Sequence, residues 1–273
     1  MYVQLILATI SARFGGEVFL LTKTSNAKRR QLIVGNWKMN GNQQFNAELL
    51  AEVVTGWQGE HNADVVICPP NPYLLHTYER ISGSSFFLGA QNVSQYDSGA
   101  YTGEVSAQML ADLHCKFVII GHNERRRLQG ETDEQVAQKF IAAQRSNLIP
   151  ILCIGESLAQ RENGQHIDVI RKQLDTVFSC VSRDVFVNAV VAYEPVWAVG
   201  TGKTATPQQA HEVHRFIREH LGDVAEEVRI LYGGSVKASN AEQLFALQDI
   251  DGALLGGASL DAKEFLKICN AAD

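Results

Sequence analysis

The chain has 273 residues, of which 45% are hydrophobic and 20% are charged. This composition is typical of a globular protein with one sizeable core, and the length suits one large domain as well as two smaller ones. The formal net charge of −6 argues against a general role in binding nucleic acid or a membrane surface. We therefore expect neither a nucleic-acid partner nor a membrane partner. An anionic small molecule remains compatible with this charge, because local donors can bind it.

The first thirty residues differ from the rest of the chain. Apolar stretches in MYVQLILATI and GEVFLLTK are interrupted by polar residues and glycine well short of the length of a membrane span. A secretory signal has basic residues ahead of its apolar part, whereas residues 1–9 carry no charge. We predict that residues 1–30 are an accessory extension of unknown role, with a processed targeting segment as the alternative. Residues 31–273 are predicted to form a single catalytic domain that folds without the extension.

From Leu32 onward, short apolar runs alternate with stretches of helical period. The runs are LIVGNW (32–37), DVVICP (64–69), SFFLGA (85–90), FVIIGH (117–122), PILCIG (150–155), AVVAYE (189–194), VRILYG (228–233) and GALLGG (252–257). Short continuous apolar runs suit strands that are covered on both faces, as in a parallel sheet. Eight such units without a Gly/Ser-rich linker predict an α/β fold, a closed (β/α)8 barrel of eight parallel strands, each followed by a helix.

Helix start signals lie between the runs. Thr132 to Gln135 resembles a capping box, and Thr206 precedes a proline at the predicted first helical position. Pro72 is predicted to begin a helix in the same way. The five cysteines contain no CxxC pair, and three lie in or beside apolar runs, so we expect buried, reduced thiols and a cytoplasmic protein.

Polar side chains stand at the C-terminal ends of several predicted strands, where the active sites of barrels lie. The first strand ends at Asn36 and Lys38, the fourth at His122, and the sixth at Glu194. A glutamate can remove a carbon-bound proton, a histidine can hydrogen-bond a carbonyl oxygen, and a lysine can stabilise negative charge there. Each residue alone could have a structural role. Their joint position predicts proton transfer beside a carbonyl group.

Glycines follow the last three strands, at Gly200-Thr201-Gly202, Gly233-Gly234-Ser235 and Gly256-Gly257. Any one of these groups alone would indicate only a tight turn. Together, the loops after strands seven and eight resemble the phosphate site of many barrels, where backbone N–H groups hold the anion. A phosphate site beside a proton-transfer site suggests a small phosphorylated carbonyl compound as substrate.

Five segments resemble the triosephosphate isomerase family, and the resemblance runs from about Gln31 to the C-terminus. They are GNWKMNG (35–41), IIGHNERR (119–126), AYEPVWAVGTGK (192–203), YGGSV (232–236) and DGALLGGASL (251–260). The resemblance implies interconversion of dihydroxyacetone phosphate and glyceraldehyde 3-phosphate through an enediolate, in glycolysis and gluconeogenesis, with no cofactor and no metal. It also implies a homodimer formed through segment 89–106. Two alternatives are another sugar-phosphate barrel enzyme and a catalytically silent barrel. The first has no reason to contain EPVWAVGTGK, and the second predicts loss of the catalytic residues.

The resemblance also implies individual roles. Glu194 is expected to be the base, His122 the neutral electrophile, kept neutral by the positive end of the helix that follows, and Lys38 the charge-stabilising cation, paired with Glu124. The substrate-binding set implied by the family is Asn36, Lys38, Gly200, Ser235, Gly256 and Gly257. Residues 195–203 are similar to the family's lid, with Trp197 as an anchor.

Asn123 departs from the family's pattern, which usually has serine at this position. We expect it to cap the following helix, to donate a hydrogen bond to Glu194 and to affect catalysis only modestly.

Overall fold

The structure is a computed structural model that describes residues 13–14, 17–18, 29–198 and 205–273. Most of the predicted extension, 1–30, therefore lies outside the described residues. Within it, β1 (Arg13–Phe14) pairs antiparallel with β2 (Glu17–Val18). No helix in the described part of the chain is long and apolar enough to cross a bilayer.

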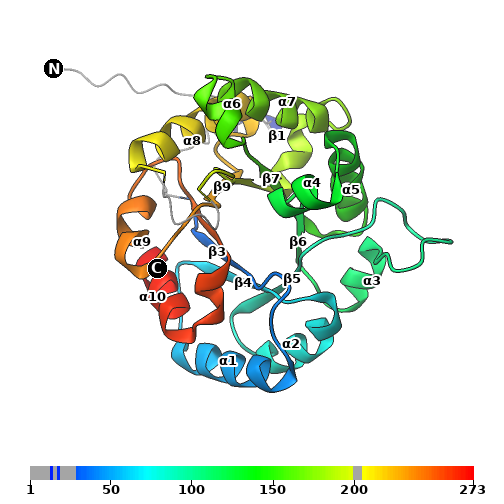
Figure 1. Ribbon diagram of the computed structural model, residues 1–273, viewed down its shortest axis with the longest axis vertical. Helices are drawn as coiled ribbons and strands as arrows, with labels where there is room; N and C mark the ends of the chain where they lie inside the picture. Colours follow the sequence, from blue (N-terminus) through cyan, green and yellow to red (C-terminus); the bar gives the residue numbers. More distant parts are fainter. Residues whose placement is uncertain (1–12, 15–16, 19–28, 199–204) are drawn as a thin grey trace.

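Eight parallel strands form a closed barrel in the order β10-β3-β4-β5-β6-β7-β8-β9, and helices surround it (Figure 1). The strands are β3 (Leu32–Asn36), β4 (Asp64–Cys68), β5 (Phe86–Ala90), β6 (Phe117–Ile120), β7 (Ile149–Ile154), β8 (Val190–Tyr193), β9 (Arg229–Tyr232) and β10 (Gly252–Leu255). Leu32 pairs with Asp64 on one side and with Gly252 on the other, and this register closes the barrel. The predicted (β/α)8 barrel is confirmed, and each strand lies within about a residue or two of its predicted run.

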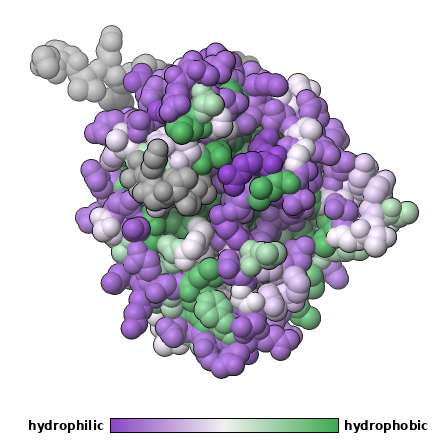
Figure 2. Space-filling view, in the orientation of Figure 1, coloured by the Kyte–Doolittle hydropathy of each residue, from purple (hydrophilic) through white to green (hydrophobic). Residues whose placement is uncertain are grey.

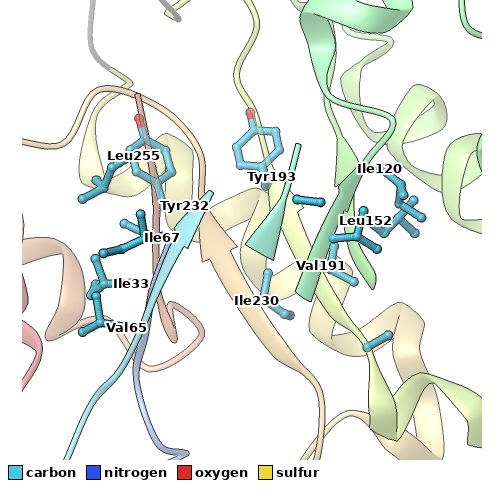
Figure 3. Close-up of a cluster of buried hydrophobic side chains, with 14 of the residues drawn as sticks. Ile33, Val65, Ile67, Ile120, Leu152, Val191, Tyr193, Ile230, Tyr232 and Leu255 are labelled. Atoms are coloured by element: carbon cyan, nitrogen blue, oxygen red, sulfur yellow. The ribbon is translucent and has the colours of Figure 1, made fainter. Parts of the chain in front are cut away.

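Residues of each strand alternate between two apolar clusters. Leu32 and Val34 belong to the cluster inside the barrel, whereas Ile33 belongs to the larger cluster between the strands and the helices. Figure 3 shows part of this outer cluster, to which several strands contribute side chains, among them Val65 of β4 and Tyr193 of β8. The alternation follows from the two-residue period of a strand, and it decides which strand-end side chains face the interior.

Two of the helices begin with the capping boxes that the sequence predicts. The helices are α1 (Gln43–Gly56), α2 (Leu74–Ile81), α3 (Ala107–Asp112), α4 (Asn123–Gln129), α5 (Asp133–Arg145), α6 (Leu158–Glu162), α7 (His166–Phe178), α8 (Pro207–Leu221), α9 (Ala238–Phe245) and α10 (Ala262–Ala272), with 3-10 turns η1 (Asn71–Tyr73), η2 (Arg183–Asn188), η3 (Gly222–Val224) and η4 (Gly257–Leu260). Thr132 and Thr206 cap α5 and α8 in capping boxes, as predicted. Pro72 instead lies in η1, so α2 begins two residues later than predicted.

Arg29, just ahead of β3, binds the barrel at the end opposite the strand C-termini. Its Nε lies 2.8 Å from Oδ1 of Asp251, whose side chain is 4% exposed, and its Nη1 lies 3.0 Å from Oε2 of Glu226. Arg218 of α8 binds the other oxygen of Asp251 at 2.5 Å, and the N–H of Ile230 donates to that oxygen at 2.8 Å. Asp251 therefore links Arg29 to α8 and to β9.

These contacts sharpen the expectation that the extension is dispensable. A chain lacking residues 1–28 keeps Arg29, so we expect its melting temperature to equal that of the full chain. A chain lacking residues 1–29 loses only Arg29 in addition, and Asp251 keeps Arg218. We expect this second chain to lose about 1 kcal/mol of stability, which lowers the melting temperature by roughly 2–4 °C. Scanning calorimetry of the two truncated chains measures the difference, and identical melting temperatures would contradict the assignment to Arg29.

Candidate active site

The C-terminal ends of the barrel strands surround a cavity of about 560 Å³. The predicted site residues that line it are Asn36, Lys38, His122, Glu194, Ser235, Gly256 and Gly257. They come from β3, β6, β8, β9 and β10 or from the loops that follow, so barrel closure brings together residues that are far apart in the sequence. Gly200 and the other residues of the predicted lid from 199 to 203 lie outside the described residues.

Glu194 continues the inward-facing side of β8. Val190 and Ala192 face the barrel interior, and the two-residue period places the next inward side chain at Glu194, which is 2% exposed. Two glycines make room for it. A Cβ at Gly155 would lie 1.9 Å from the carbonyl oxygen of Glu194, and a Cβ at Gly233 would lie 2.9 Å from its Cγ. Side chains at these positions would displace the carboxylate.

Three donors surround the Glu194 carboxylate. The backbone N–H of Asn123 donates to Oε2 at 2.9 Å, and its Nδ2 donates to Oε1 at 2.7 Å. His122 Nε2 lies 3.0 Å from Oε1. Burial alone would raise the pKa of Glu194, but the charge and hydrogen bond of His122 and the two N–H groups of Asn123 outweigh it and lower the pKa. The carboxylate is therefore ionised at neutral pH although it is buried.

His122, rather than Asn123, caps α4. Its Nδ1 accepts the N–H of Glu124 at 3.3 Å, and its backbone has the non-helical φ of −53° and ψ of 141°. Asn123 is the first helical residue, which frees its amide to donate to Glu194. The predicted cap at Asn123 is thus wrong by one residue, whereas the predicted contact with Glu194 is confirmed.

The protonation of His122 is set by opposing influences. Burial lowers its pKa, but the carboxylate of Glu194 at 3.0 Å and that of Glu124 at 3.6 Å raise it, and the net direction is upward. The sequence predicted that the positive end of α4 keeps the imidazole neutral. In this arrangement the charge of Glu194, which rests directly on the imidazole, opposes the effect of burial, so the neutral imidazole stays a prediction.

Lys38 has a left-handed backbone conformation, with φ of 53°. Two side chains hold this turn: Oδ1 of Asn36 accepts the N–H of Lys38 at 3.0 Å, and Nε2 of Gln91 donates to its carbonyl oxygen at 2.9 Å. A non-glycine residue in this region is strained and persists only where its surroundings fix it. The turn brings Nζ to 2.5 Å from Oε1 of Glu124, which confirms the expected ion pair. Sequence reasoning missed Gln91, although it follows β5 at the same end of the barrel.

The other half of the cavity is built from the loops after β9 and β10. Among the described residues, no group bonds to the backbone N–H of Gly234, Ser235 or Val236. Free N–H groups beside an open cavity are suited to hold the oxygens of an anion. Sequence reasoning missed three charged residues that also line this half, which are Lys237, Asp261 and Glu264.

Two further observations complete the surroundings. Nε1 of Trp197 donates to Oε1 of Glu156 at 2.8 Å, and the hydroxyl of Tyr193 donates to the same oxygen at 3.0 Å, so Trp197 is anchored as predicted. In the described part of the chain, no group of three His, Cys, Asp or Glu side chains is arranged to hold a metal ion.

Comparison with known proteins agrees with this geometry. The profile of the family described as triosephosphate isomerase matches residues 31–272. The chain belongs to the triosephosphate isomerase family. A curated triosephosphate isomerase of Nitrosomonas europaea is 55% identical over 248 residues, which cover 89% of this chain and 98% of the relative. A relative with the same name from Nitrosococcus oceani is 52% identical, and the match covers 89% of this chain and 99% of the relative. Another from Shewanella piezotolerans is also 52% identical, and the match covers 90% of this chain and 98% of the relative.

The hydrogen bonds of Asn123 lead to a prediction about Glu194. Replacing Asn123 with alanine removes the Nδ2 donor and keeps the backbone donor, so the ionised carboxylate loses one of its stabilising contacts. We expect the pKa of Glu194 to rise in Asn123→Ala, and to rise less in Asn123→Ser, whose hydroxyl can still donate. A carbon-13 NMR titration of the Glu194 carboxyl measures this shift. An unchanged pKa in the alanine variant would show that the side-chain contact does not stabilise the charge.

Proposed function

We propose that the protein interconverts dihydroxyacetone phosphate and glyceraldehyde 3-phosphate, in glycolysis and gluconeogenesis, by proton transfer through an enediolate. Membership in the triosephosphate isomerase family supports this function. The observation that carries it in the structure is that Glu194, ionised and 2% exposed, shares one cavity with His122, with Lys38 and with backbone N–H groups to which no group of the described residues bonds. The cavity thus combines a base, two groups suited to a carbonyl oxygen and a place for a phosphate.

Glu194 acts as the base in this proposal. Its carboxylate removes a proton from the hydroxyl-bearing carbon next to the substrate's carbonyl group and returns it to the former carbonyl carbon. A proton also passes from the hydroxyl oxygen to the former carbonyl oxygen, so the ketone is exchanged for the aldehyde. Once the present hydrogen bonds of Glu194 are released, its buried carboxylate holds a negative charge away from water. The carboxylate then accepts a proton more readily. Its present contacts with Asn123 and His122 define a resting position from which it turns toward the substrate.

His122 and Lys38 stabilise the enediolate oxygen. Nε2 of His122 can bond to only one acceptor strongly, so the substrate oxygen takes the place that Oε1 of Glu194 now occupies at 3.0 Å. When Glu194 moves away and takes up a proton, the main influence that raises the pKa of His122 disappears. The imidazole then donates from its neutral form while Nδ1 accepts the N–H of Glu124. The ammonium of Lys38 adds positive charge on the same side.

The phosphate is proposed to bind in the half of the cavity formed by the loops after β9 and β10. Ser235, Gly256 and Gly257 supply backbone N–H groups there, and glycine permits the close approach of an oxygen. Gly200 belongs to this proposed set and lies outside the described residues. Asn36, at the end of the neighbouring strand β3, lines the same cavity beside Lys38 and completes the proposed substrate contacts.

A homodimer formed through segment 89–106 is part of the proposal. The connection from β5 to α3 projects from the barrel at the right of Figure 1, and in Figure 2 it is mostly pale where the surrounding surface is hydrophilic. Tyr96 and Tyr101 stack on it at 3.9 Å and are 43% and 42% exposed. Met39, next to the catalytic lysine, is 94% exposed. Exposed apolar side chains of this kind support a protein–protein contact.

The cysteines support the proposed cytoplasmic location. All five are free thiols, and all except Cys180 are buried. Free buried thiols are typical of proteins in a reducing compartment.

The catalytic prediction concerns Glu194→Gln. The amide preserves the shape but cannot accept a proton, so we expect kcat to fall by about a thousandfold or more, while binding of a phosphate-containing inhibitor changes little. A coupled isomerase assay and inhibitor titration on the same preparation measure both quantities. Glu156→Gln is not a suitable control because Glu156 holds Trp197. Glu227 is exposed and does not line the cavity, so Glu227→Gln should retain activity. Activity of Glu194→Gln within tenfold of the unaltered protein would remove Glu194 from the role of base.

The dimer prediction concerns Met39 and Tyr101. Introducing glutamate at both positions places charge in the proposed interface, so we expect the variant to sediment as a monomer and the unaltered protein as a dimer. Val187→Glu is the matched control, because Val187 is 43% exposed in η2 at the other end of the barrel. A monomeric unaltered protein, or a double variant that stays dimeric, would contradict the proposed interface.

A further inference from the structure

Lys237 is a charged residue of the cavity to which the proposed mechanism gives no role. It precedes α9, lies two residues after Ser235, lines the phosphate half of the cavity and is exposed. The other lysine of the cavity, Lys38, is already paired with Glu124 at 2.5 Å. Within residues 29–198 and 205–273, the ammonium of Lys237 forms no ion pair, so its charge is not neutralised by a neighbouring carboxylate.

Two carboxylates share this half of the cavity with Lys237, and both are occupied. Oε1 of Glu264 accepts the N–H of Ala238 at 2.8 Å, at the start of α9. Oδ1 of Asp261 accepts the N–H of Glu264 at 2.9 Å, at the start of α10. These contacts hold the two carboxylates at the cavity wall, where they repel an incoming anion. Binding of a doubly charged phosphate is therefore favoured by a cation that, unlike Lys38, is not already paired with a carboxylate.

We propose that Lys237 is a substrate-binding residue whose ammonium attracts and holds the phosphate of a phosphate monoester dianion. This inference rests on the proposed function and adds a residue to its phosphate site. The backbone N–H groups of Ser235, Gly256 and Gly257 fix the position of the phosphate oxygens. Lys237 supplies the charge: a compact ammonium on a flexible stem, two residues after Ser235 in the same loop.

The kinetic effect of Lys237 follows from its chemistry. The phosphate carries the same charge in the substrate and in the transition state. A contact with it therefore strengthens the binding of the substrate and the binding of the transition state to the same degree. Loss of the contact therefore raises KM and lowers kcat/KM while kcat stays nearly constant. Because Lys237 is exposed, dissolved salt screens its charge, and the effect should be largest at low ionic strength.

The test compares Lys237→Gln, Lys237→Arg and the control Lys263→Gln. Lys263 is an exposed lysine of α10 that does not line the cavity, so its substitution changes the net charge equally. At an ionic strength of about 10 mM, we expect Lys237→Gln to lower kcat/KM by roughly three- to tenfold with kcat within about twofold. The difference should shrink at about 0.3 M salt. Lys237→Arg, which keeps the charge, and Lys263→Gln should behave as the unaltered protein does.

Binding of inorganic phosphate, followed by phosphorus-31 NMR, separates this inference from the proposed reaction. Weaker phosphate binding to Lys237→Gln than to Lys263→Gln supports the role of Lys237 even if the unaltered protein shows no isomerase activity, a result that would overturn only the proposed function. Equal kinetics and equal phosphate affinity for the two glutamine variants would overturn the inference. A fall in kcat at constant KM would overturn it as well, because it would place Lys237 in the chemical step.

Discussion

Closure of the parallel barrel is the constraint on which the site depends. Because all eight strands run in the same direction, their C-terminal ends form a single rim, and residues more than two hundred positions apart share one cavity. The strand period then selects which side chains enter it. Glu194 follows Val190 and Ala192 on the inward side of β8, so its burial results from its place in the strand. Gly155 and Gly233 leave the space that this place requires.

A carboxylate that is buried in this way must be supplied with donors, or it would take up a proton. Asn123 and His122 supply them, and both stand at the start of α4, directly after β6. The same arrangement links substrate binding to the chemistry, because the substrate oxygen and Glu194 compete for Nε2 of His122. In this account the resting hydrogen bonds keep the base ionised, and their exchange for substrate contacts activates it. The departure from serine at position 123 is compatible with this, since asparagine provides both a backbone and a side-chain donor.

The sequence predicted the parts of the structure that depend on local pattern. Continuous apolar runs predicted the strands, and threonine followed by glutamine or proline predicted the starts of α5 and α8. The prediction from sequence was wrong where the outcome depends on the backbone angles of a single residue. His122 caps α4 in place of Asn123, because His122, with ψ of 141°, is the last residue with a non-helical backbone before the helix. The left-handed turn at Lys38 and the role of Gln91 in holding it were also not predictable, because they depend on contacts between neighbouring strands.

Electrostatic properties were the least predictable from sequence. The start of a helix is expected to disfavour a charged histidine, yet a carboxylate 3.0 Å away raises the pKa of His122, and no local sequence pattern indicates that contact. The ion pair between Arg29 and Asp251 joins residues 222 positions apart, and no sequence signal marks it. The family resemblance did predict the cavity residues that the structure brings together, but it did not single out Lys237.

The central claim is that a carboxylate in this cavity moves a proton between two adjacent carbons of a triose phosphate. Isomerisation of dihydroxyacetone phosphate in deuterium oxide, with the product analysed by proton NMR, tests it most directly. A proton held on Glu194 can exchange with solvent, so the account predicts that a fraction of the glyceraldehyde 3-phosphate carries deuterium on the carbon that receives the proton. Product formed entirely without deuterium would indicate direct hydride transfer between the carbons and would contradict the account.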